Sequence, residues 1–154
     1  MQKLGGKFMK NALSVKLNKY LASLGVEYIK LHNLHWNVVG INFKAIHEYL
    51  ESLYDGVTAS LDAVAELLKM HDVVPYASLK EFLQASPIEE LSSVEIKGVD
   101  ALKIVLKDFE LMKSLAEEIR SEADEENVYD VVSMMEDDLA QFNKSIWFIK
   151  AMLK

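Results

Sequence analysis

The chain has 154 residues, of which 51% are apolar and 27% charged, so it is long enough for one well-buried domain and too short for two. Its formal net charge of −7 argues against general attraction to nucleic acid or to an anionic membrane, because phosphate binding needs clustered Lys and Arg. The sequence has no cysteine, which excludes disulfides, zinc fingers and thiol catalysis, and no apolar run reaches the ~18 residues of a transmembrane helix.

The N-terminal segment, residues 1–10, contains three lysines but is not followed by an apolar segment of signal-peptide type. We therefore expect a short mobile tail at residues 1–10. Residues 11–154 are expected to form a single domain.

Two long helical patterns follow the tail. The first runs from about Asn11 to Val38, with apolar residues recurring at spacings of three and four. Gly40 favours a stop, and Asn42 favours the N-cap of a second helix that runs from about residue 43 to residue 70. The two helices are expected to lie antiparallel because the turn between them is short.

The long connection that follows covers residues 71–98 and contains both prolines of the chain. Within it, residues 78–83 are predicted to form a short helix. Ser78 is the expected cap, with Glu81 three residues later as its reciprocal partner.

The second half of the chain contains two further long helical patterns. One runs from about Asp100, its expected N-cap, to Glu122. An acidic stretch at residues 124–127 interrupts the apolar rhythm, and the last helix then runs to about Leu153. Four long helices with one long middle connection predict an all-α fold, a four-helix bundle with a crossover that carries a short extra helix.

The second helix carries a polar sector beside its apolar face. At 100° per residue, this sector contains His47, Glu51, Asp62 and Glu66. Beyond it lies a patch of small residues, namely Gly56, Ala59, Ser60 and Ala63. This patch is either an ordinary solvated face or a close contact with a second copy of the chain, which would be two-fold.

Metal-ligand side chains lie at both ends of the predicted hairpin. Asp62 and Glu66, four residues apart, point the same way and suit one cation. His35 and His47 lie together at the other end, and imidazole with carboxylate suits iron, zinc or manganese. At ~1.5 Å per residue Asp62 lies roughly 22 Å along the helix from His47, so a shared metal requires two chains.

Each of these side chains also has a purely structural interpretation. Single histidines on apolar helices usually form structural hydrogen bonds, and we assign His32 and His71 to that class. Asp62 and Glu66 alone would be surface charges, and Trp36 would be core packing. The motif Glu-x-x-His does not occur in the sequence, so the di-iron centre that lies inside a single four-helix bundle is excluded.

The combined pattern resembles the Dps family, also called mini-ferritins. The matching stretch reads His35-Trp36-Asn37-Val38-Val39-Gly40, then Phe43, His47 and Glu51, then Asp62-Ala63-Val64-Ala65-Glu66. Residue types and spacings agree together, and a weaker likeness extends over the whole chain, including Trp147 in the last helix. The resemblance implies a ferritin-like fold and a dodecameric hollow shell.

The resemblance also implies residue roles. His35 and His47 would bind iron from one chain, with Glu51 assisting, and Asp62 and Glu66 would bind it from a neighbour. Trp36 would lie beside the site and intercept oxidising equivalents. The chain departs from the pattern at Glu51, where many members have Asp, and at Leu67, where many have Arg.

The implied function is that of a cytoplasmic ferroxidase and iron store that protects against oxidative stress. Fe²⁺ would be oxidised to Fe³⁺ with hydrogen peroxide, although zinc or another divalent metal also suits the ligands. Glu126 and Asp130 would line ion-entry pores, or simply favour a helix N-terminus. DNA binding is expected to be weak or absent. The alternative is a non-catalytic DNA-condensing or structural shell with a structural metal site.

Overall fold

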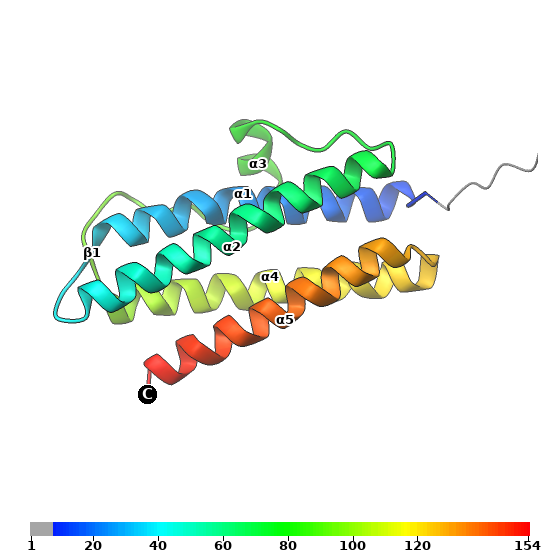
Figure 1. The fold of residues 1–154 in the computed structure, drawn as a ribbon. Coiled ribbons are helices and arrows are strands. Elements are labelled where there is room, and N and C mark those ends of the chain that lie inside the picture. The colour runs from blue at the N-terminus through cyan, green and yellow to red at the C-terminus, as the bar shows by residue number, and fades with distance from the viewer. Residues whose placement is uncertain (1–7) are drawn as a thin grey trace, which may run out of the picture.

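The computed structural model describes residues 8–154, which form five helices and one pair of short strands (Figure 1). The helices are α1 (Asn11–Asn37), α2 (Phe43–Met70), α3 (Leu79–Ala85), α4 (Gly98–Glu126) and α5 (Tyr129–Met152). The predicted all-α bundle with a helix-bearing crossover is confirmed. Within the described residues, no helix has the length and apolar character needed to cross a membrane.

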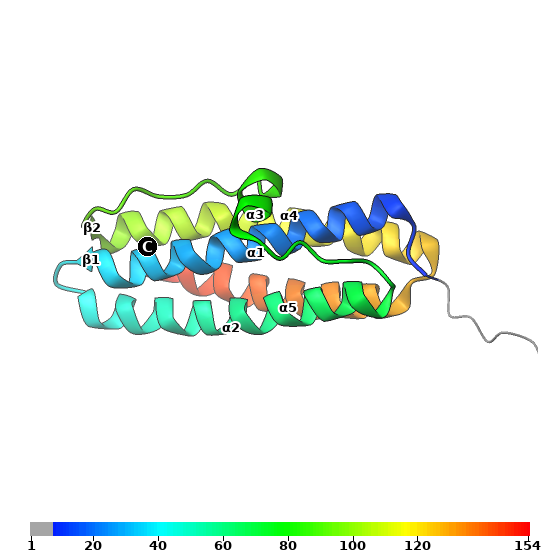
Figure 2. The same cartoon turned by 90° about the horizontal axis from the view of Figure 1, so that it is seen from above.

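The four long helices form two antiparallel hairpins, α1 with α2 and α4 with α5 (Figure 1). Helix α1 is central, because it packs against α2, α3 and α4, whereas α2 and α5 contact each other only slightly. The crossover from α2 to α4 passes over the outer side of α1, as Figure 2 shows from above. The core therefore lies between the hairpins and is lined mainly by leucine, isoleucine and valine.

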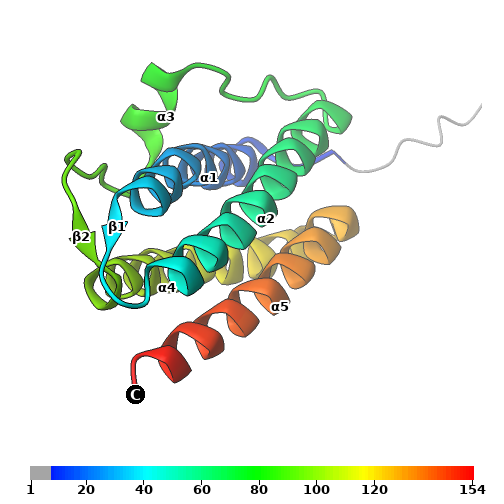
Figure 3. The ribbon, with the colours of Figure 1, turned by 60° about the vertical axis from the view of Figure 1, so that its left-hand side comes forward.

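A short parallel pair of strands closes one end of the bundle and was not predicted. Strand β1 (Val38–Val39) pairs with β2 (Ile96–Lys97). Gly40 follows β1 with a φ of +118°, a conformation that only glycine adopts without strain. The pair ties the end of the crossover to the turn between α1 and α2 (Figure 3). His35 lies three residues before β1, and His47 lies four residues after the start of α2.

The short helix α3 confirms the predicted capping box. The Ser78 side chain accepts a hydrogen bond from the backbone N–H of Glu81, and the Glu81 carboxylate accepts from the Ser78 hydroxyl. The Phe82 ring lies directly over Gly25 of α1, where an added Cβ would stand 2.3 Å from the ring. Gly25 therefore permits the crossover to pack closely on the bundle.

Helix α4 is longer at both ends than predicted. It begins at Gly98 with Lys97 as N-cap, and Asp100 lies in its first turn. It continues past Glu122 to Glu126 and ends at Asn127, which adopts a left-handed conformation. The acidic stretch does not break the helix, because Ala123 and Glu126 continue the buried face.

The expected tail is only partly described, since residues 1–7 lie outside the described residues. Met9 is buried, and its backbone N–H donates to His71 Nδ1 at 3.3 Å. The backbone N–H of Lys10 donates to Glu126 Oε2 at 3.1 Å, at a helix start that has no cap from its own side chains. The last residues of the segment thus pack against the bundle.

Candidate metal centre

His35 and His47 face each other where α1 ends and α2 begins. Their rings stack with centroids 3.7 Å apart. His35 Nδ1 lies 2.7 Å from the carbonyl oxygen of His47, and His47 Nδ1 lies 2.7 Å from that of His35. A carbonyl oxygen only accepts, so both Nδ1 atoms donate and each neutral ring keeps a free lone pair on Nε2. Both Nε2 atoms are therefore available as possible metal ligands.

Aromatic side chains surround the pair and restrict its motion. Phe43 packs on the ring of His47 at 5.0 Å, and Tyr54 meets the ring of His35 edge-on at 5.2 Å. Tyr54 also stacks on His32 at 3.8 Å. Trp36 lies 5.3 Å from His32 and is 68% exposed. Trp36 is therefore a surface residue beside the histidines, not a core residue.

The carboxylates of the predicted set all lie on α2 and are exposed. Glu51 follows His47 by about one turn, and Asp62 and Glu66 lie toward the far end of the helix. Partial burial, followed by the charges of Glu51 and Asp55, raises the pKa of Tyr54. Within residues 8–154 of one chain, no three His, Asp or Glu side chains form a group that could hold a metal ion. One copy therefore brings the histidines together but not the complete set.

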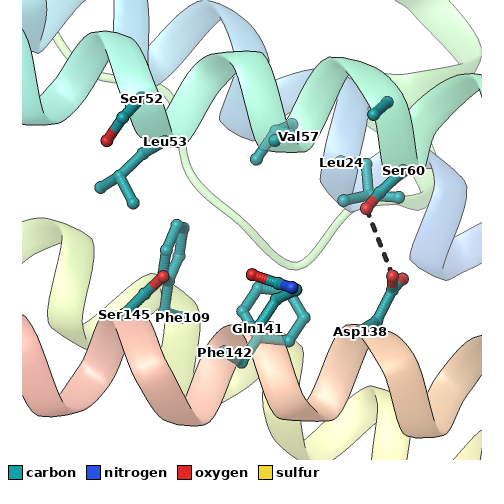
Figure 4. A pocket seen from close by; sticks show the side chains of 12 residues that line it. Leu24, Ser52, Leu53, Val57, Ser60, Phe109, Asp138, Gln141, Phe142 and Ser145 are labelled. Carbon is teal, nitrogen blue, oxygen red and sulfur yellow. Dashed lines mark hydrogen bonds between the residues drawn. The ribbon is translucent and has the colours of Figure 1, made fainter.

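Three of the four small residues of α2 border a cavity within the same chain. Gly56, Ala59 and Ser60 line a cavity of about 400 Å³ between α2 and α5 (Figure 4). In it, Asp138 accepts hydrogen bonds from Tyr20 and Ser60 at 2.7 and 3.3 Å. Partial burial raises the pKa of Asp138. The cavity contains none of the predicted ligands.

The other two histidines have structural partners, as predicted. His32 Nδ1 donates to the carbonyl oxygen of Tyr28 at 2.7 Å. His71 accepts from the backbone of Met9, and its Nε2 lies 2.8 Å from Asp130 Oδ2. Of the two predicted pore residues, Glu126 is buried and bonded to the start of α1, and Asp130 is about half exposed and bonded to His71.

Tyr54 belongs to the site and was missed in the sequence. It contacts both His32 and His35. The sequence could have indicated it, because Tyr54 lies seven residues after His47 and therefore about two turns further along the same helix face. The reciprocal hydrogen bonds between His35 and His47 could not be predicted from the sequence, since they depend on the geometry of the turn between α1 and α2.

Comparison with known proteins supports the resemblance. The ferritin-like domain family matches residues 15–154. Antigen TpF1 of Treponema pallidum is 38% identical over 143 residues, covering 93% of this chain and 81% of the antigen. The DNA protection during starvation protein of Brevibacillus brevis is 34% identical over 145 residues, covering 92% of this chain and 95% of the relative.

Solved structures agree with these sequence matches. The crystal structure of antigen TpF1 superposes with a TM-score of 0.91, covering 93% of this chain and 92% of the antigen chain. A Dps protein from Vibrio cholerae, described as a member of a broad superfamily of ferritin-like diiron-carboxylate proteins, is 26% identical with a TM-score of 0.89. That match covers 93% of this chain and 89% of the other.

Proposed function

This chain belongs to the ferritin-like proteins and, among them, to the Dps family, and from this premise we propose that it is a ferroxidase and iron store. Iron storage and protection are the general role that this membership supports. In the proposal Fe²⁺ is the substrate, hydrogen peroxide is the oxidant, and ferric mineral accumulates inside a cytoplasmic dodecameric shell.

The observation that carries the proposal is the reciprocal hydrogen bonding of His35 and His47. Each ring is oriented by the backbone of the other residue, so neither needs to reorganise when a metal binds. Fixed orientation by a second hydrogen bond is the usual condition of metal-binding histidines, and its loss typically lowers metal affinity 10–100-fold. Among residues 8–154 neither Nε2 atom forms a hydrogen bond, so both are available to a metal.

The remaining ligands come from a second copy of the chain. Asp62 and Glu66 are exposed and lie roughly 22 Å along α2 from His47, too far to close a site within one chain. In a two-fold contact the carboxylate end of one α2 meets the histidine end of the other, and two identical sites form. Glu51 lies one turn from His47 and assists on the histidine side.

The proposed chemistry moves two electrons for each peroxide. Two Fe²⁺ ions lose one electron each, the O–O bond of one hydrogen peroxide breaks, and its oxygen atoms leave as water or as oxide and hydroxide of the ferric product. Imidazole nitrogen with carboxylate oxygen is a donor set suited to Fe²⁺, and zinc would compete for it without undergoing oxidation. Trp36, exposed beside the site, intercepts oxidising equivalents that escape the iron.

Iron entry belongs to the same proposal. Asp130 is the better candidate for an entry pore, since its carboxylate is about half exposed. Glu126 is buried and occupied by the backbone of Lys10, so its contribution requires that this contact opens. Acidic side chains at a pore raise the local concentration of cations.

The test is complementation between two inactive variants. His47→Ala removes one half of the site and Asp62→Ala the other, and each should nearly abolish fast Fe²⁺ oxidation after anaerobic loading and peroxide addition. If the variants are co-expressed, half of randomly formed pairs contain one of each, and one of the two sites in such a pair is intact. About a quarter of the wild-type sites should therefore return.

Three outcomes would contradict the proposal. Normal oxidation by both single variants would show that the ligands are wrongly assigned. A co-expressed mixture no more active than its parents, with the assembly intact, would show that the site does not span two chains. Gel filtration near the mass of a single chain would exclude the two-chain site.

DNA binding is proposed to be weak. The net charge of −7 repels phosphate, and only Lys3, Lys7 and Lys10 of the N-terminal segment favour it. At ~0.15 M salt, where the Debye length is about 8 Å, we expect no mobility shift of duplex DNA. A steep shift under those conditions would favour the DNA-condensing alternative.

A further inference from the structure

A cluster of three buried charged residues lies inside the bundle, between α1 and α4 and away from the proposed iron site. Glu27 on α1 is completely buried, with no exposed surface. Lys30 follows it by one turn, and Asp108 approaches from α4. Lys30 and Asp108 are also buried, and Lys30 Nζ lies 2.6 Å from Asp108 Oδ2. These three side chains form a buried polar cluster in the interface between α1 and α4.

The charges of this cluster do not balance if both carboxyl groups are ionised. Asp108 and Lys30 cancel each other in a close ion pair, so an ionised Glu27 would leave one negative charge buried. Such a charge costs several kcal/mol even after the protein relaxes around it. A neutral Glu27 removes this cost without moving any atom of the fold.

Hydrogen bonding leads to the same conclusion. Neither carboxyl oxygen of Glu27 has a hydrogen-bond partner among the described residues, and the buried Asp108 Oδ2, apart from its ion pair with Lys30, has none either. The carboxyl group of Asp108 lies within hydrogen-bonding reach of that of Glu27. Two ionised carboxylates are both acceptors and cannot bond to each other. With a proton on one of them, the same contact becomes an O–H···O hydrogen bond, and the buried oxygen is satisfied.

We propose that Glu27 is a neutral carboxylic acid in the folded subunit and donates its proton in a hydrogen bond to Asp108, so that the interface between α1 and α4 holds one buried proton. The proton resides on Glu27 because Asp108 contacts the Lys30 ammonium directly, which favours the ionised form of Asp108.

The electrostatic surroundings of Glu27 agree with this assignment. Burial and then the neighbouring Asp108 raise the pKa of Glu27 well above its ordinary value, and Lys30 opposes them with a smaller effect. The groups that act on Glu27 are Lys30 from its own helix and Asp108 from α4, and no charged side chain of α2, α3 or α5 within the described residues adds to them.

A pH dependence of stability follows from the buried proton. Above the ordinary pKa of 4.5 the unfolded chain has released this proton, but the folded chain retains it. Folding therefore binds a proton, and the free energy of unfolding falls as the pH rises toward the pKa of Glu27 in the fold. Above that pKa, two negative carboxylates meet and the contact between α1 and α4 weakens.

Infrared spectroscopy of the assembled protein tests the proton directly. At about pH 7 an ordinary glutamate is ionised, so a carboxylic-acid C=O band reports a group of raised pKa. We expect this band in the wild type and its loss in Glu27→Gln. Asp138→Asn is the matched control, because Asp138 also has a raised pKa, and the band assigned to Glu27 should survive in it.

A denaturation series provides the second readout. Between about pH 7 and about pH 10 the wild-type denaturation midpoint should fall, whereas Glu27→Gln should not follow it, since the amide N–H replaces the acid O–H toward Asp108. If Glu27→Gln does not assemble, the carboxylic-acid band can instead be followed in Asp138→Asn as the pH is raised. We expect this band to disappear.

Two results would overturn the proposal. A spectrum of Asp138→Asn at neutral pH without an acid band would show that Glu27 is ionised, with a buried water or a cation as its partner. An acid band retained in a variant that carries both Glu27→Gln and Asp138→Asn would assign the proton to another residue. Neither result bears on iron oxidation, because this cluster and the histidine pair share no side chain.

Discussion

The two ends of the hairpin formed by α1 and α2 carry the two halves of the proposed site. The side chains at one end are held by contacts within the chain, and those at the other end are not. At one end, His35 is buried, stacked on His47 and tied to it by two hydrogen bonds of 2.7 Å. At the other end, Asp62 and Glu66 project from an exposed helix surface. The histidine half is thus organised within one chain, and the carboxylate half depends on what meets it.

This difference means that one half of the site stabilises the single chain and the other half does not. The histidines contribute to the fold of the single chain, because their hydrogen bonds close the turn between α1 and α2. The carboxylates are exposed and contribute little to that fold, and in the proposed site they serve a partner chain. Mutations at the two ends should therefore affect activity alike and stability unequally.

The largest expected effect compares His35→Ala with Asp62→Ala. Each removes a proposed ligand, and each should slow peroxide-driven Fe²⁺ oxidation by about 100-fold or more, beyond the effect of losing a supporting residue. Stopped-flow absorbance of ferric product after anaerobic loading measures this loss.

Stability should distinguish the same two variants. His35→Ala removes a buried hydrogen bond and a stacked ring, which costs about 1–3 kcal/mol, whereas Asp62→Ala should stay within about 0.5 kcal/mol. Denaturation must be compared at equal protein concentration, since assembly contributes to stability. Equal destabilisation by both variants would show that the two ends are not organised differently.

Glu51 should have an intermediate effect, because it lies near the histidines but is exposed. Glu51→Gln keeps the size of the side chain and removes its charge, so we expect an about tenfold slower oxidation with the assembly unchanged. Glu48→Gln, an exposed change on the same helix outside the proposed ligand set, is the matched control. If both variants oxidise iron at the wild-type rate, Glu51 does not assist the site.

Gly25→Ala should destabilise the protein without affecting either half of the site. Its Cβ would stand 2.3 Å from the Phe82 ring, so α3 must move away from α1. Overpacking of this kind costs about 1–3 kcal/mol, partly offset by up to about 1 kcal/mol of better helix propensity. Denaturation and amide exchange in α3 should report the change, while iron oxidation per assembled site stays normal.

The helices and the separated ligands followed from the sequence because they depend on local periodicity. The 3.6-residue repeat places four long helices, and fifteen residues of helix suffice to put Asp62 out of reach of His47. The capping box of Ser78 and Glu81 was equally local, and it is present.

The features that the sequence did not predict depend on contacts between distant segments. The pairing of Val38 with Ile96 and the packing of Phe82 on Gly25 join residues far apart in the chain. The acidic stretch after Glu122 looked like a helix end, but tertiary packing of Ala123 and Glu126 continues the helix. Likewise, the cavity between α2 and α5, which three of the small residues of α2 border, depends on packing between distant helices.

The smallest expected effect concerns α3, which contains none of the proposed ligands. Hydrogen bonds from the Ser78 hydroxyl and then the Ala77 backbone N–H lower the pKa of Glu81. A lowered pKa means that the ionised form stabilises α3 above the ordinary value of 4.5, and that this contribution is lost as the pH falls through the pKa of the folded state. Amide exchange in α3 should therefore accelerate in acid in the wild type and depend less on pH in Glu81→Gln. An acid response retained in full by Glu81→Gln would assign the loosening to other carboxylates, and a simultaneous loss of the histidine contacts would show that the crossover supports the organised half of the site after all.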